Sequence, residues 1–123
     1  MTPDAEPTPT GAEPAGRAET PSPDELDHAV EVLRLLADHT RLAILALLHG
    51  RELSVTAIAE HLGRPVPGIS QHLAKLRTGN LVTSRRDGTT VYYTQPDEHV
   101  AALVLNVLQH TEHHLYDRPP HHR

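Results

Sequence analysis

Eleven of the 123 residues are histidines, and more than half of them gather near the C-terminal end of the chain. This group consists of His99, His110, His113, His114, His121 and His122, with Asp97 close by. His110 and His113 are three residues apart, so on a helix their imidazoles can bind one ion, and His114 is an alternative partner of His110. Imidazole and carboxylate groups are common ligands of zinc and related metals. Because the chain has no cysteine, thiolate metal sites and disulfides are excluded.

The spacing of these ligands sets a geometric problem. His99 precedes His110 by eleven residues, which is close to three full turns, so the two share one helix face. They are nevertheless about 16 Å apart along the axis, whereas a metal–nitrogen bond is about 2 Å. One helix therefore cannot close the site, but an antiparallel copy in a two-fold dimer can bring Asp97 and His99 of one chain to His110 and His113 of the other. One carboxylate and three imidazoles suit tetrahedral zinc.

Apolar residues between the two ligand pairs are expected to form the dimer contact. They are Val100, Leu103, Val104, Val107 and Leu108. The alternative is a helix whose histidines face solvent and bind nothing.

The elements that position these residues follow from caps and apolar spacing. Ser22, Asp38 and Ser54 are each suited to begin a helix, and Ile69, Leu73 and Leu76 mark a fourth. The period then changes: residues 82–94 alternate around Asp87-Gly88 and predict a two-stranded hairpin. A last helix is expected from about residue 97 to residue 116, since Pro119-Pro120 forbids its continuation. Helices, a hairpin and a helix predict an α+β, mostly helical fold of the winged helix-turn-helix type.

Charge points to DNA within an otherwise acidic chain. The net charge is −5, yet the stretch from Arg64 to Arg86 has five basic residues and no acidic one. If residues 54–80 form a helix-turn-helix, the second helix enters the major groove by its N-terminal part. The candidate base or phosphate contacts are Ser70, Gln71, His72, Lys75, Arg77, Arg85 and Arg86. The alternative is an ordinary helical hairpin with a solvated polar face.

Several segments resemble a known family. Residues 38–45 read Asp-His-Thr-Arg-Leu-Ala-Ile-Leu, and residues 69–73 read Ile-Ser-Gln-His-Leu. The hairpin carries Arg85-Arg86-Asp87-Gly88 and Val91-Tyr92-Tyr93. Over residues 26–116 the chain resembles ArsR/SmtB-type metalloregulatory repressors. The resemblance implies a homodimeric winged helix with a long C-terminal dimerisation helix, which represses metal-efflux or sequestration genes and leaves operator DNA when metal binds.

The resemblance also assigns ligands. Asp97, His99, His110 and His113 match the family's last-helix pattern Asp-x-His, ten residues, His-x-x-His. Hydroxyls stand at Ser54 and Thr56, where other members have cysteines, so a site for arsenic, cadmium or lead is not expected.

Which ion binds stays open between zinc, which we favour, and nickel or cobalt. His-bearing tails occur in nickel- and cobalt-sensing relatives, and here His114, His121 and His122 are the extra candidates. By resemblance, His110 binds the ion with one ring nitrogen and donates its other ring N–H to the carbonyl of Asn80. The start of the recognition helix departs from the family, since Pro65 and Pro67 lack the usual hydroxyls, so no base contact is expected there.

Composition divides the chain and excludes several functions. Residues 1–23 hold six of the eleven prolines and predict a disordered tail, residues 24–116 a single domain, and residues 117–123 a His-rich tail. No apolar run reaches the ~20 residues of a membrane span, so a cytoplasmic protein is expected. A metallohydrolase is not favoured, because its metal needs an open ligand position. A metal-storage protein is not favoured either, because that function leaves the predicted hairpin unexplained. A winged-helix regulator that answers a non-metal signal remains an alternative.

Overall fold

The structure of the protein, a computed structural model, describes residues 20–116, with side chains described as far as Thr111. The segment 117–123 and nearly all of 1–23 lie outside these residues, so the expectations for both tails, including those for His121 and His122, remain predictions. The chain divides into two compact units, Met1–Leu33 and Arg34–Arg123, and the boundary falls inside a helix. Each unit is described by itself below.

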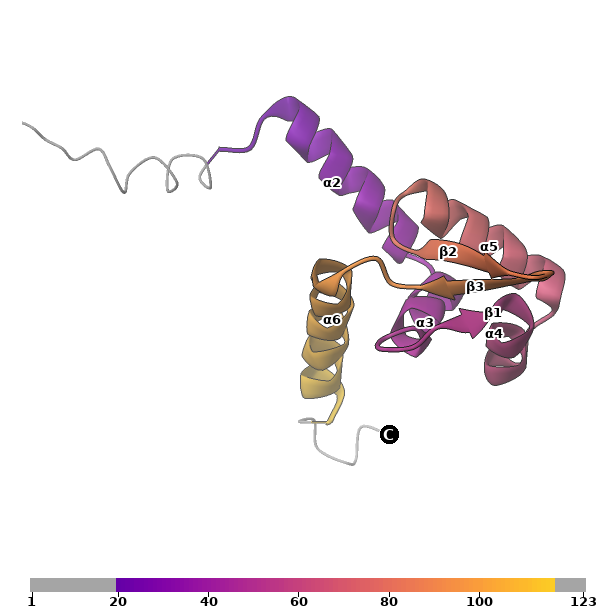
Figure 1. Ribbon diagram of the computed structural model, residues 1–123. Helices are drawn as coiled ribbons and strands as arrows, with labels where there is room; N and C mark the ends of the chain where they lie inside the picture. Colours follow the sequence, from indigo (N-terminus) through magenta and orange to yellow (C-terminus); the bar gives the residue numbers. More distant parts are fainter. Residues whose placement is uncertain (1–19, 117–123) are drawn as a thin grey trace, which may run out of the picture. The chain divides into compact units, whose positions relative to one another are not determined.

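The order of elements is that of a winged helix-turn-helix, as the sequence predicts (Figure 1). The elements are α2 (Pro23–Leu36), α3 (His39–Leu47), β1 (Leu53–Ser54), α4 (Val55–Leu62), α5 (Val66–Thr78), β2 (Thr83–Asp87), β3 (Thr90–Thr94) and α6 (Glu98–Tyr116). Within residues 20–116, no helix is both long enough and apolar enough to span a membrane.

Side-chain caps fix the beginnings of the first three helices. Ser22 and Glu25 form a reciprocal capping box at the start of α2, with N–H to oxygen distances of 2.7 and 3.1 Å. The Asp38 carboxylate accepts the Arg41 N–H at 2.9 Å, and the Ser54 hydroxyl accepts the Ala57 N–H at 3.1 Å. All three caps confirm the helix starts that the sequence predicts, because each satisfies a donor that the first turn leaves unpaired.

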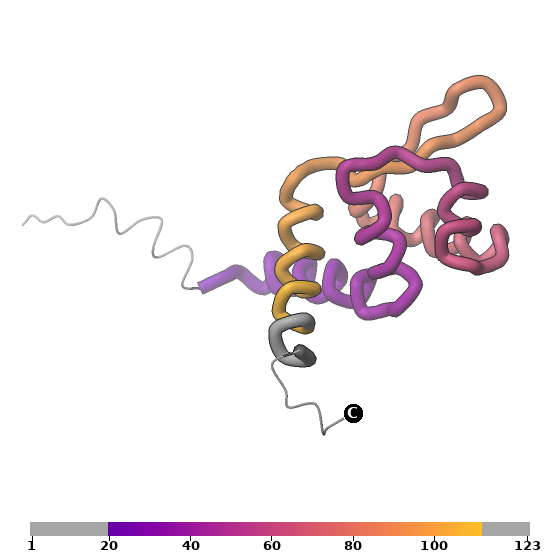
Figure 2. The backbone as a smooth tube through the Cα atoms, turned by 90° about the horizontal axis from the view of Figure 1, so that it is seen from below, coloured from indigo at the N-terminus to yellow at the C-terminus, as the bar shows by residue number. Residues whose placement is uncertain are grey.

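The wing is a three-stranded antiparallel sheet in the order β1-β3-β2. Strands β2 and β3 form the predicted hairpin, which projects from the helices in Figure 2, with Gly88 at its tip. The third strand, in which Leu53 and Ser54 pair with Tyr93 and Tyr92, is not predicted from the sequence. This short strand anchors the base of the hairpin to the segment that begins α4.

The core of the second unit gathers around α3. Its residues Ile44 and Leu45, and Leu48 just after it, are fully buried together with Ile58 of α4 and the inner side of α5. Helix α6 lies against α3 (Figures 1 and 2).

This packing corrects one expectation about the dimer contact. Val100 and Val104 are only 8% and 3% exposed in the single chain, so they belong to its own core and not to the contact between subunits. Val107, by contrast, remains exposed.

Two glycines of the helix-turn-helix give a matched test of this backbone. Gly63 ends α4 at φ +64°, a conformation that costs an L residue about 1 kcal/mol, whereas Gly68 lies inside α5 with open space around it. We expect Gly63→Ala to lower the free energy of unfolding by about 1 kcal/mol and Gly68→Ala to raise it by about 0.5 kcal/mol. Chemical denaturation at one fixed protein concentration measures both. A Gly63→Ala variant as stable as the wild type contradicts the described turn.

Candidate functional site

The helix-turn-helix holds α5 with one side in the core and the other outward. Ile69, Leu73 and Leu76 of α5 are fully buried, which fixes the rotation of the helix about its axis. Ser70, Gln71, Lys75 and Arg77 are consequently exposed, as a groove-reading helix requires. The structure therefore brings these four candidate DNA contacts to the open side of α5.

His72 is placed differently from its neighbours. Its side chain is only 27% exposed, and its Nδ1 lies 3.8 Å from Asp38 Oδ2 and 3.3 Å from Arg41 Nη1. The Arg41 guanidinium in turn donates to the carbonyls of Leu35 and Arg34 at 2.6 and 3.3 Å. His72 thus connects the recognition helix to the start of α3 and, through Arg41, to the last turn of α2. Unlike Ser70 and Gln71, it does not lie on the exposed side of α5.

Asp38 is the anionic member of this group. Its pKa is lowered chiefly because its carboxylate accepts the Arg41 backbone N–H, with further contributions from the charges of Arg41 and His72 and from the Thr40 N–H. The group is therefore ionised at neutral pH, and the adjacent Arg41 guanidinium balances its charge.

On the wing, Arg85 already has a partner within the chain. Its Nε and Nη2 donate to the two oxygens of Glu52 at 2.8 Å each, and its guanidinium carbon lies 4.9 Å from the centre of the Tyr92 ring. The hydrogen bonds from Arg85 lower the pKa of Glu52. A DNA phosphate has to compete with this carboxylate for Arg85, whereas Arg86 is exposed on the same strand.

The candidate metal ligands lie along α6, which is a single helix from Glu98 to Tyr116. Asp97 Oδ1 accepts the N–H groups of His99 and Val100 at 2.9 and 3.1 Å, so Asp97 caps the helix. A carboxylate has a second oxygen, and the cap holds this group in one position while Oδ2 can take a ligand. His99 and His110 are exposed, and the continuous helix keeps them about 16 Å apart.

No complete metal site is present within one chain among the residues described. Over residues 20–111, no three His, Asp or Glu side chains lie close enough together to hold an ion. Positions 113 and 114 are helical, but their side chains lie outside the description, as do His121 and His122. Asn80 follows α5 with φ +62°, and its link to His110 stays a prediction.

Sequence reasoning missed the partners of two of its candidates. The Asp38 cap is predicted, but its approach to His72, which is 34 residues away, requires the packing of α3 against α5. The same holds for Glu52 and Arg85, which are 33 residues apart and meet because β1 joins the wing. No local pattern in the sequence signals either pair.

The chain is similar to several known transcriptional regulators. A helix-turn-helix domain model matches residues 36–85. The chain is 49% identical over 100 residues to the HTH-type transcriptional regulator KmtR of Mycobacterium tuberculosis, covering 81% of this chain and 77% of KmtR. It is 40% identical over 91 residues to the HTH-type transcriptional repressor SmtB of the same organism, covering 73% and 67% of the two chains.

Solved structures agree with these relatives. The homodimeric winged helix-turn-helix DNA-binding domain of Mb0332 from Mycobacterium bovis superposes with a TM-score of 0.70 at 38% identity, covering 76% of this chain and 87% of that one. HlyU from Vibrio cholerae gives 0.66 at 34% identity, covering 79% and 100%. With its winged helix and these relatives, the chain belongs to the ArsR/SmtB family of winged-helix transcriptional regulators.

Proposed function

We propose that this protein is a metal-responsive repressor that binds operator DNA as an apo homodimer and releases it when a metal ion bridges the two α6 helices. One observation carries the proposal: α6 is a continuous helix that holds Asp97 and His99 at one end and His110 and His113 about three turns away. Each end supplies half of a ligand set, and only a second chain can bring the halves together.

The DNA-binding half uses the open side of α5 and the wing. Ser70 and Gln71 are suited to base edges or phosphates near the N-terminal part of α5, and Lys75, Arg77 and Arg86 to backbone phosphates. A two-fold dimer presents two such helices about one duplex turn apart. No residue from Arg64 to Arg86 is acidic, which lowers the cost of approaching the duplex.

Exposed apolar side chains support a second copy of the chain as the partner. On α2, Leu26, Val30 and Leu33 are 51%, 44% and 58% exposed and lie at helical spacing along one side. On α6, Leu105 and Val107 are 42% and 40% exposed. Apolar surfaces of this kind on helices are typical of subunit contacts, and the similar Mb0332 domain is described as homodimeric.

The donor set favours zinc. One carboxylate and three imidazoles supply four ligands, all oxygen or nitrogen, which matches tetrahedral zinc. The capping bonds to Asp97 place its carboxylate at the start of α6 before any ion arrives. Nickel or cobalt sensing is the alternative within the same fold, because His114, His121 and His122 could raise the coordination number.

Contacts within the second unit connect α6, which carries the candidate metal ligands, to the recognition helix α5. Gln95, just before α6, donates to the Leu45 carbonyl of α3 at 2.7 Å. At its other end α3 meets His72 of α5 through Asp38 and Arg41. When metal fixes α6 against its copy, α3 and α5 are constrained with it. In the proposed mechanism, DNA favours a different subunit arrangement from the one that metal favours.

A second candidate is a regulator of the same fold that answers a signal other than metal. The similarity to HlyU of Vibrio cholerae, which is described as a transcriptional activator, favours it. In that case, the histidines of α6 face solvent and leave DNA binding unaffected.

Metal titration during DNA binding separates the two candidates. We expect Zn(II) to weaken binding to a duplex selected from a random pool by about 5–150-fold, the effect of a coupling of about 1–3 kcal/mol. His99→Ala and His110→Ala should abolish this effect without changing apo binding, while His28→Ala on α2 should behave as the wild type. Parallel titrations with Ni(II) and Co(II) rank the ions. A DNA affinity that none of the three ions changes contradicts metal sensing.

Asp97 allows the helix cap to be separated from the metal ligand. Asparagine caps a helix as well as aspartate but is a poor metal ligand, whereas alanine does neither. We expect Asp97→Asn and Asp97→Ala both to weaken Zn(II) binding, but only Asp97→Ala to lower the free energy of unfolding of the apo protein, by about 1 kcal/mol. Calorimetric metal titration and denaturation measure the two effects. Wild-type Zn(II) affinity in Asp97→Asn removes Asp97 from the site.

A further inference from the structure

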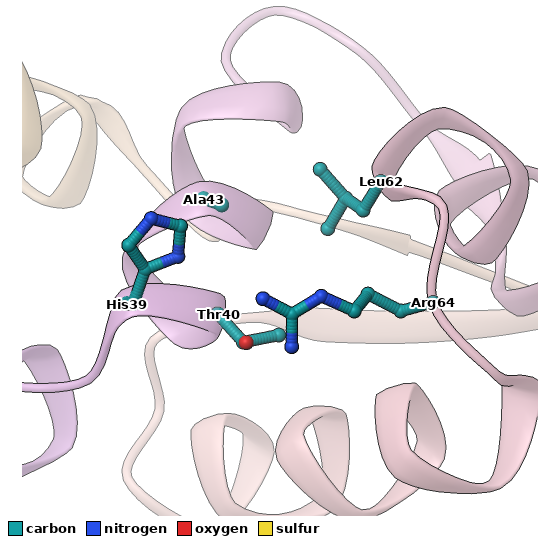
Figure 3. Close-up of a pocket in the computed structure, with 5 residues that line it drawn as sticks. All are labelled: His39, Thr40, Ala43, Leu62 and Arg64. Carbon is teal, nitrogen blue, oxygen red and sulfur yellow. The ribbon is translucent and has the colours of Figure 1, made fainter.

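A small cavity lies between the start of α3 and the end of α4, outside the residues assigned above. It measures about 50 Å³, is partly open to solvent, and is lined by His39, Thr40, Ala43, Leu62 and Arg64. Figure 3 shows the Arg64 side chain, which follows the end of α4, extended toward Thr40 and His39 in the first turn of α3. We call this cavity the Arg64 notch.

Thr40 gives the notch an unused hydrogen-bonding group. The residue is only 7% exposed, and its hydroxyl has no hydrogen-bond partner among residues 20–111. A buried hydroxyl without a partner destabilises the folded chain. A ligand oxygen in the notch would remove this cost.

Arg64 gives the notch a positive charge that no carboxylate of the described chain neutralises in an ion pair. The nearest acidic group along α3 is Asp38, whose charge is already balanced by Arg41 and whose oxygens accept the Thr40 and Arg41 N–H groups. Arg64 therefore gives the notch a cation that an anion can neutralise.

The recognition helix adds to this field. Helix α5 begins at Val66, two residues after Arg64, and has Pro65 as its N-cap, with no side-chain cap and no acidic residue in its first turn. The partial positive charge of the helix N-terminus is consequently not offset by its own side chains. The volume of the notch fits a few water-sized atoms, which is enough for the free oxygens of one phosphate but not for a nucleotide.

We propose that the Arg64 notch binds one phosphate of the DNA backbone, through the Arg64 guanidinium and the Thr40 hydroxyl. The proposal rests on DNA binding by α5. When the N-terminal part of α5 enters the major groove, the phosphates that border the groove lie beside the residues that precede the helix. The notch positions the protein on the duplex and does not read base sequence.

The salt dependence of binding to a mixed-sequence 30-base-pair duplex tests this role. Log K falls as log salt rises, and loss of one phosphate contact per chain lowers the magnitude of this negative slope by about 0.9, or about 1.8 for a dimer. We expect this decrease for Arg64→Gln and a smaller one for the control Arg51→Gln, which removes an equal charge before β1. Thr40→Val should weaken binding several-fold with no change in slope. Its unfolding midpoint should equal or exceed that of the wild type, since an unpaired hydroxyl is lost.

Three results overturn the proposal. Equal slopes for Arg64→Gln and Arg51→Gln reduce Arg64 to general electrostatics. Wild-type affinity in Thr40→Val removes the hydroxyl from the contact. If inorganic phosphate shifts the amide resonances of Thr40 and Arg64 while both variants bind the duplex normally, the notch takes free phosphate and not DNA. A wild-type protein that binds no duplex defeats the proposed function itself, which distinguishes the two failures.

Discussion

A rigid helix with candidate metal ligands at both ends is the constraint on which the proposed function depends. Helix α6 is continuous from Glu98 to Tyr116, so its backbone hydrogen bonds fix the distance between His99 and His110 at about 16 Å. No rotamer change of two imidazoles closes such a gap to metal-bonding distance. Under the proposed function, this separation makes the metal site a sensor of subunit arrangement, because the candidate ligands can meet only when two copies are antiparallel.

Under the proposed function, helix α3 is the element through which metal binding at α6 can affect DNA binding by α5. It supplies the centre of the core with Ile44 and Leu45. Its carbonyl at Leu45 accepts the amide of Gln95 before α6, and its capping residue Asp38 lies beside His72 of α5. A buried helix held at both ends transmits displacement and does not absorb it, since close-packed interiors have little free volume. The Arg64 notch adjoins the same first turn of α3.

Interactions between residues close in the sequence predicted most of the fold but few of the contacts that the candidate site residues make. Caps at Ser22, Asp38 and Ser54 need only neighbouring residues, so the sequence predicts these helix starts correctly. The two-residue strand β1 was missed because only its pairing with Tyr92 and Tyr93, about 40 residues later, makes it a strand. In the same way, a helical stripe cannot show which apolar side chains the chain buries within itself. Val100 and Val104 proved to be core residues, and Leu105 and Val107 remained outside.

Subunit complementation tests the shared site most directly. One variant carries Asp97→Asn with His99→Ala and lacks the first ligand pair; the other carries His110→Ala with His113→Ala and lacks the second. Neither homodimer should bind Zn(II) in calorimetric titration. A heterodimer isolated with two different affinity tags should bind one ion with near wild-type affinity, because one complete ligand set forms across its interface. A heterodimer that binds no ion, or a single variant that binds as the wild type does, contradicts a site built between two chains.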